Sequence, residues 1–364
     1  MSGHSHEFYF DFDDDHMSES DRLANVTNIN DTTLDELNVL IAAVVSLIFN
    51  IALIFATVKT KIFSESARKM QIFSCILRLI FSIIIVLCSP TLAYIDEAKA
   101  VYIVKGGFEL PLFFGEEFFG EVVLVLFLTF VIFSCLGPPA QFIQTCLIIK
   151  RSNMAHSQNK MFIVTTIFAI ILASIGGYLV IYGYIPDDDD HKLSVEIVYF
   201  LNGKGSSAFL IASTEKYSYE LHQFVPDQKT FVCTGYIISI FIVSTIIVGV
   251  CYYLIEAQRK QQSKSESTTK SQKQLSRILL VQFALPLFTI HIPFYITFAA
   301  PLFDLDTDRF SIFLPFLFSW CPALNPILVM ILVKSIREKI LLVRAASNRF
   351  SSVNFSSKKS TNKS

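Results

Sequence analysis

The hydrophobic pattern of this chain consists of seven long apolar runs separated by polar segments. A membrane-spanning helix needs about 20 apolar residues to cross roughly 30 Å of hydrocarbon, and each run reaches that length. The runs cover residues 38–58, 70–94, 118–149, 161–182, 231–255, 275–300 and 310–333. We therefore predict an all-α membrane protein, built as a bundle of seven transmembrane helices.

Charged residues divide unequally between the two sides of the predicted bundle. The segments 59–69, 150–160, 256–277 and 334–364 together hold 21 Lys and Arg, whereas the segments on the opposite side hold 8. Because Lys and Arg concentrate in cytoplasmic loops, we expect the amino end to lie outside. Acidic residues divide the other way, with 26 outside and 4 inside. Apart from Arg277, which lies at the inner edge of the sixth run and is counted with the segment 256–277, Arg78 and Glu121 are then the only Asp, Glu, Lys or Arg within the runs.

The composition agrees with a membrane protein. Apolar residues make up 52% of the 364 residues, only 17% are charged, and 35 are phenylalanine. A soluble domain of this length would need a more polar surface. We expect the lipid bilayer as a partner, no nucleic acid, and no cofactor.

The first 37 residues form an acidic, polar segment without a long apolar core. We expect it to be a disordered extracellular tail without a cleaved signal peptide. Asn25 and Asn30 each begin an acceptor sequence for N-glycosylation, and we predict that both are modified. Histidines beside an aspartate run are interpreted as part of a solvated tail rather than as a metal site: His4, His6, His16 and Asp13–Asp15.

The polar segments on the basic side suggest contacts in the cytoplasm. From Lys334 to Arg344, basic and aliphatic residues alternate as in a helix lying at the headgroup level. We assign 38–333 to the bundle and 334–364 to a cytoplasmic amphipathic helix with a basic tail. Residues 256–273 are interpreted as a flexible linker that can also contact anionic lipid or a cytoplasmic protein.

A few polar and small residues interrupt the apolar runs. Asn50 is expected to form a hydrogen bond between helices, and Gly176 and Gly177 should let two helices approach closely. Arg78 either extends to the membrane surface, the alternative we favour, or pairs inside the bundle. All seven cysteines lie in or beside the runs. We interpret Cys88 and Cys233 as buried thiols, although a bond between them is left open.

Two stretches between the runs on the outer side have the composition of β-hairpins. Residues 99–113 surround Gly106 and Gly107, and residues 194–212 surround a glycine-rich turn at 202–205. We predict that these two hairpins cover the outer mouth of the bundle.

Prolines inside the runs provide bending points, because each removes a backbone donor and crowds the preceding turn. We expect the run at 118–149 to form one kinked helix rather than two. The predicted hinges are Pro138, Pro139, Pro286, Pro293 and Pro326.

Several of these positions resemble nematode seven-transmembrane chemoreceptors of the Str superfamily. The resemblance is carried by Asn50, by the segment 139–143, by Gln282 with Pro286 and Pro293, and by Trp320–Pro326. It covers the seven runs and excludes both tails. Asn325 departs from it, since Asp is frequent there in such receptors. The inner end of the third run also lacks the Asp-Arg-Tyr that is expected of a typical rhodopsin-like receptor. The resemblance implies a G-protein-coupled chemosensory receptor in the plasma membrane or cilia of sensory neurons.

From these residues we predict a small, mostly apolar ligand in the outer half of the bundle, because such sites combine apolar walls with a few polar groups. The predicted ligand contacts are Glu121, His291, Tyr295, Phe316 and Trp320. Opening of the inner ends would expose basic residues to a heterotrimeric G protein, unless these are ordinary cytoplasmic-side cations. They are Lys150, Arg151, Arg259, Lys260 and Arg337. Pairing of the receptor with itself or with another chain is left open.

A transporter or a ligand-gated channel is the main alternative. Ion-coupled carriers need ionisable groups through the midplane and often contain internal repeats. Away from the edges of the runs, the only Asp, Glu, Lys or Arg are Arg78 and Glu121, and the runs show no repeat. An intramembrane enzyme is disfavoured because no His-Glu-x-x-His, no Gly-x-Ser-x-Gly and no carboxylate pair lies within the runs. A passive adhesion or scaffold protein remains an alternative.

Overall fold

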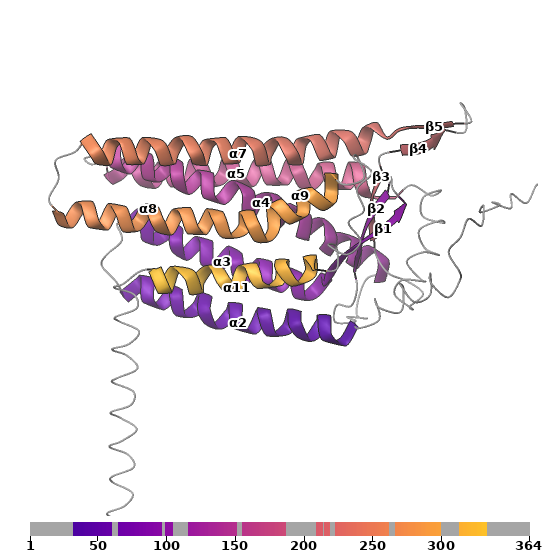
Figure 1. The fold of residues 1–364 in the computed structure, drawn as a ribbon, viewed down its shortest axis with the longest axis horizontal. Helices are drawn as coiled ribbons and strands as arrows, with labels where there is room; N and C mark the ends of the chain where they lie inside the picture. The colour runs from indigo at the N-terminus through magenta and orange to yellow at the C-terminus, as the bar shows by residue number, and fades with distance from the viewer. Residues whose placement is uncertain are drawn as a thin grey trace, which may run out of the picture.

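The computed structural model describes residues 32–59, 65–96, 99–104, 116–150, 155–186, 209–213, 215–218, 223–261, 266–299 and 313–332. Within these residues, seven helical segments long and apolar enough to cross a membrane lie side by side, with strands at one end (Figure 1). They are α2 (Thr32–Lys59), α3 (Glu65–Cys88), α4 (Glu116–Lys150), α5 (Ala155–Tyr184), α7 (Gln228–Gln261), α8 (Glu266–Pro286) with its continuation, and α11 (Leu314–Leu332). The predicted seven-helix bundle is confirmed.

Helix α4 occupies the interior of the bundle. It packs against α3, α5, α7 and α8, and Leu124, Phe127 and Phe142 on it are fully buried. Helix α5, in contrast, turns large apolar side chains outward, with Val164 64% and Phe168 61% exposed. Helix α5 is apolar on every face, as expected for a helix that packs against the bundle on one side and faces lipid on the other.

The predicted close approach at Gly176 and Gly177 is confirmed. A Cβ atom on Gly176 would lie 2.6 Å from Cδ1 of Ile132, and one on Gly177 would lie 2.5 Å from Oγ1 of Thr129. Both neighbours belong to α4, so the absence of a side chain allows α5 to pack closely against it.

The second helix ends earlier than predicted. Helix α3 ends at Cys88, and Ser89 has a φ of 36°, with its N–H donating to the Ile85 carbonyl at 2.8 Å. This left-handed residue is a common way to close a helix, and Pro90 cannot continue it. The apolar residues up to Tyr94, which we had assigned to the helix, instead form strand β1 (Pro90–Asp96).

A three-stranded antiparallel sheet lies at the end of the bundle that we call the sheet end (Figure 1). Strand β2 (Lys99–Val104) pairs with β1, so the chain reverses between Asp96 and Lys99. The prediction that β2 pairs across a turn at Gly106 and Gly107 is wrong, and these two glycines lie outside the described residues. On its other edge β2 pairs with β3 (Phe209–Ser213), which joins two loops that are distant in sequence.

The second predicted hairpin is described only in part. Its later half contains β3, while residues 187–208 lie outside the described residues. A separate hairpin that we did not predict follows it, formed by β4 (Glu215–Ser218) and β5 (Gln223–Pro226). It lies beyond the start of α7 in Figure 1.

At the opposite end, the predicted linker at 256–273 is largely helical. Helix α7 continues to Gln261, and α8 already begins at Glu266. The polar composition did not indicate these helical residues, because a helix that extends beyond a membrane no longer needs apolar side chains. Only residues 262–265 of this connection lie outside the described residues.

The predicted hinge prolines lie inside helices. Helix α4 runs through Pro138 and Pro139 as one continuous helix, as expected. After Pro286 the chain adopts a π-helical segment, η2 (Leu287–His291), before α9 (Ile292–Ala299), which contains Pro293. Such wider turns occur where the regular ladder of backbone hydrogen bonds is interrupted. Pro322 and Pro326 lie in α11.

Candidate functional site

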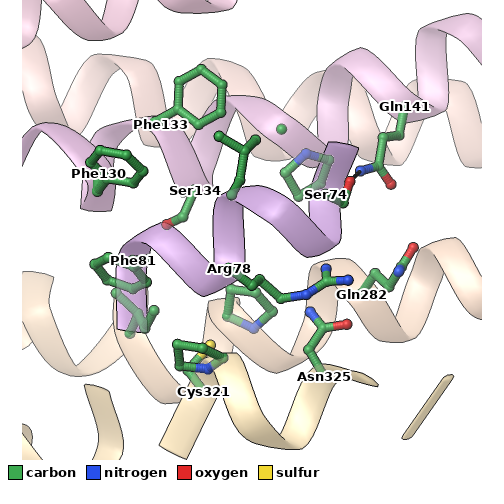
Figure 2. Close-up of a pocket in the computed structure, with 16 residues that line it drawn as sticks. Ser74, Arg78, Phe81, Phe130, Phe133, Ser134, Gln141, Gln282, Cys321 and Asn325 are labelled. Atoms are coloured by element: carbon green, nitrogen blue, oxygen red, sulfur yellow. Dashed lines mark hydrogen bonds between the residues drawn. The ribbon is translucent and has the colours of Figure 1, made fainter. Parts of the chain in front are cut away.

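A cavity of about 100 Å³ lies in the middle of the bundle, between α3, α4, α8 with η2, and α11. One water molecule needs roughly 10–15 Å³ by this measure, so the space admits several waters or a small molecule. Figure 2 shows the side chains around it. They are Ser74, Leu77, Arg78, Phe81, Phe130, Phe133, Ser134, Gly137, Pro138, Gln141, Gln282, Pro286, Ile290, Cys321, Pro322 and Asn325.

The wall of the cavity is aromatic on one side and polar on the other (Figure 2). Phe81 and Phe130 stack with their ring centroids 6.1 Å apart and an interplanar angle of 6°. On the polar side, Gln141 Nε2 donates to Ser74 Oγ at 2.6 Å. The cavity thus has the character of a small-molecule site, mainly apolar with a few placed polar groups.

Arg78 supplies the charge on the polar side. It lies ten residues from each end of the span Arg68–Cys88, about 15 Å at 1.5 Å per residue. Its guanidinium extends toward Gln282 and Asn325 (Figure 2), and its Nε donates to Oδ1 of Asn50 at 3.1 Å. The favoured expectation that Arg78 extends to the membrane surface is wrong, because the surface is too distant and partners lie within the bundle.

Asn50 joins three helices beside the cavity, as the interhelical role predicted for it requires. Its Nδ2 donates to the carbonyl of Ser46 at 2.9 Å and to the carbonyl of Pro322 at 3.1 Å. The Pro322 carbonyl is available because Pro326, four residues later, has no N–H to bond to it. Asn50, on α2, therefore connects α11 through this carbonyl and α3 through Arg78.

The predicted ligand contacts His291 and Tyr295 lie together, on η2 and α9. His291 is buried, with Nε2 3.3 Å from Ser134 Oγ and Nδ1 3.5 Å from Cys135 Sγ. The ring of Tyr295 lies 6.3 Å from that of His291, between centroids. Because Ser134 also lines the cavity, His291 is separated from the cavity by one side chain.

The structure places Phe316 and Trp320 elsewhere, on the side of α11 that faces α2. The indole Nε1 of Trp320 donates to Oδ1 of Asn38 at 2.9 Å, and Phe316 is 52% exposed beside it. Glu121 is half-buried near the start of α4. The five predicted contacts therefore form two separate pairs and a single residue, and none of them lines the cavity.

The residues that do line the cavity were mostly missed from the sequence. Four of them are polar residues within apolar runs, which could have marked them as candidates: Arg78, Gln141, Gln282 and Asn325. Nothing in the sequence around each one indicates that all four face the same cavity. The phenylalanines carried no signal, because 35 are spread along the chain.

The side chains of the five predicted G-protein contacts are not among those described. Arg151 and Arg337 lie outside them, and Lys150, Arg259 and Lys260 lie at the ends of α4 and α7, where only the backbone is described. Both helix ends are at the end of the bundle opposite the sheet (Figure 1). Asn25, Asn30 and the predicted amphipathic helix after Lys334 also lie outside the described residues.

Comparison with known proteins agrees with this architecture. Serpentine receptor class r-10 of Caenorhabditis briggsae is 26% identical over 109 residues, which are 29% of this chain and about a third (32%) of that protein. The crystal structure of squid rhodopsin aligns with a TM-score of 0.57 at 16% identity, covering 85% of this chain and 84% of that one. At this identity the second match shows a common fold alone.

The sequence also matches a family model described as "Serpentine type 7TM GPCR chemoreceptor Str" over residues 37–341. This range includes all seven spans, from Leu37 to Leu332, and the whole central cavity. The chain therefore belongs to the Str family of serpentine seven-transmembrane chemoreceptors.

Proposed function

We propose that this chemoreceptor binds a small, largely apolar ligand within the bundle and signals to a heterotrimeric G protein. The observation that carries the proposal is that Pro138, Pro286 and Pro322, one from each of three helices, line the same cavity. A ligand in this space would touch the points where α4, α8 and α11 lack a regular backbone hydrogen bond. Occupancy would then favour one packing of these helices over another.

Within this proposal, the ligand rests against the aromatic wall of the cavity and reaches His291 past Ser134. Tyr295 supports the histidine ring from the neighbouring turn. Glu121, Phe316 and Trp320 would be contacts for a ligand that extends toward the sheet end. A ligand shifts the equilibrium between two packings only by its difference in affinity for them.

The G protein would bind at the end opposite the sheet, where α4, α5, α7 and α8 have their polar ends. Basic residues concentrate there along the sequence, and Lys150, Arg151, Arg259, Lys260 and Arg337 are the proposed contacts. We place this end in the cytoplasm, with the receptor in the plasma membrane and, within sensory neurons, in the cilia.

The orientation can be tested by glycosylation. We expect Asn25→Gln and Asn30→Gln each to remove one glycan from the mature protein, since only an amino end outside the cytoplasm meets the transferase. The measurement is the mobility of the expressed chain before and after glycosidase treatment. A chain without any glycan, together with an amino-terminal tag accessible only after permeabilisation, would overturn this orientation and the proposed receptor topology.

The ligand site can be tested with a panel of volatile and water-soluble compounds on cells that express the chain, read out as calcium or cyclic nucleotide. For an activating compound, we expect His291→Ala and Glu121→Ala to raise the half-maximal concentration about tenfold, or about 1.4 kcal/mol each. Phe288→Ala is the matched control, because Phe288 lies in η2 but is 64% exposed. If both variants respond like the unmodified receptor at equal surface expression, these two residues are not ligand contacts.

A further inference from the structure

Arg78 is a charge in the middle of a membrane bundle, and it has no acidic partner in the part of the chain that the structure describes. Among the described residues, no carboxylate forms an ion pair with it, and its bonds are to an amide oxygen and a thiol: Asn50 Oδ1 at 3.1 Å and Cys75 Sγ at 3.2 Å. Neutral partners can satisfy hydrogen bonds but cannot offset the charge. Leaving a charge uncompensated in a low-dielectric interior costs several kcal/mol.

The cavity beside Arg78 contains unused hydrogen-bonding capacity. A guanidinium carries five N–H groups, and two of those on Arg78 have partners within the described chain. Asn325 and Gln282, 3% and 5% exposed, each have a side-chain oxygen without a hydrogen-bond partner there. Because an amide can turn to exchange its oxygen and nitrogen, Asn325 can offer N–H groups to the cavity. Gln282 Nε2 now donates to Gln71 Oε1 at 3.1 Å, and Gln71 Nε2 has no partner among the described residues. If both glutamines turn together, Gln71 donates to Gln282 and the N–H groups of Gln282 become available to the cavity.

The hydroxyl of Ser74 adds another donor. Its oxygen already accepts from Gln141 Nε2, so its own proton is directed elsewhere. Arg78, Ser74, Gln282 and Asn325 come from three helices and border one space (Figure 2). A cation in this space would be repelled by the guanidinium, and water would leave the charge unbalanced.

We propose that the cavity is a binding site for a small monovalent anion, held against Arg78 by charge and against Ser74, Gln282 and Asn325 by hydrogen bonds. Charge-assisted bonds to a guanidinium are the stronger kind in proteins. The volume of about 100 Å³ admits a chloride ion with water, or a carboxylate with a very short chain lying on Phe81 and Phe130. The inference does not depend on the proposed signalling, since the anion would balance the charge in the ligand-free receptor.

Thermal unfolding of the full-length receptor in neutral detergent tests this directly. Sodium chloride and sodium acetate are titrated against sodium gluconate, whose anion is too large for the cavity, at constant ionic strength. We expect a saturable rise in Tm of about 5 °C with a small anion, because a ligand bound only to the folded state stabilises it. A larger rise with acetate than with chloride assigns the site to carboxylates, and the reverse order assigns it to halides.

Two variants separate the site from a general salt effect. Asn325→Asp places a carboxylate beside Arg78, so we expect a Tm in gluconate near that of the unmodified receptor in chloride, with no further rise. Arg78→Gln should also lose the anion dependence, whereas Arg277→Gln, an exposed arginine on α8, should retain it. The proposal is overturned if neither anion raises Tm, or if Asn325→Asp and Arg78→Gln respond to anions as the unmodified receptor does. If Arg78→Gln does not fold, the anion dependence of Tm in Asn325→Asp decides between the two outcomes.

Discussion

Replacement of Asn50 by leucine is expected to cause the largest loss of stability of any single substitution considered for this receptor. Asn50 is fully buried and bonds to Ser46, Pro322 and Arg78 on three different helices. Individual interhelical hydrogen bonds in membranes contribute about 0.6 to 2 kcal/mol. Leucine would remove all of them and leave the Arg78 guanidinium with one fewer partner, so we expect a loss of about 3 kcal/mol or more.

The measurement is thermal unfolding followed with a thiol-reactive dye. The seven cysteines are free and six of them are buried, so the dye reacts as the bundle opens. A loss of about 3 kcal/mol corresponds to a fall in Tm of roughly 6–12 °C. Asn38→Leu is the matched control, because Asn38 lies on the same helix but its bonds within the described chain are to Trp320 and Ser319, both on one neighbouring helix.

A double variant distinguishes the role of the charge. If Asn50 matters because it solvates Arg78, then Asn50→Leu with Arg78→Met should be less unstable than the sum of the two single variants. Equal stability of Asn50→Leu and Asn38→Leu would contradict the central role assigned to Asn50.

Filling the central cavity is expected to abolish the response to ligand without unfolding the protein. A Cβ atom on Gly137 would meet no atom of the described residues within 4 Å, and Gly137 lines the cavity. The side chain of Gly137→Leu can therefore occupy the space where we place the ligand. We expect the half-maximal ligand concentration to rise about 100-fold or the response to disappear, since a blocked cavity cannot accept the ligand.

Gly249→Leu is the matched control, because Gly249 on α7 is exposed and likewise has open space around its Cβ position. Gly137 precedes Pro138, where a side chain adds some backbone crowding, so Ser134→Leu provides a second filler that is not followed by proline. Surface expression and Tm are measured for each variant. A normal ligand response in both folded fillers would place the ligand outside this cavity.

The boundary of the second helix shows how far local sequence can be interpreted. The apolar run continues to Tyr94, and hydropathy alone extends the helix to that point. The chain instead leaves the helix at Ser89 because Pro90 interrupts it and because β2 offers a pairing edge to the residues that follow. The local proline signal was present, but it was outweighed by the apolar run.

Arg78 shows where local interpretation ends. Its position in the run allowed either extension to the surface or pairing inside the bundle. Pairing inside the bundle is favoured by Asn50, 28 residues away, whose side-chain oxygen accepts from Arg78. The Nδ2 group of Asn50 donates to the Pro322 carbonyl, which Pro326 leaves without a partner in the last helix. No window of sequence around Arg78 contains these residues.

The sequence by itself determined the number of helices, their order and their membrane character, because hydropathy is a sum over neighbouring residues and each span satisfies its own backbone. It also indicated Asn50 and the paired glycines as contact points. Only the tertiary structure decided which faces of α3, α4, α8 and α11 meet around a cavity. The rotation of each helix is set by contacts with residues far away in the chain, and the π-helical turn after Pro286 shifts the register of the residues beyond it.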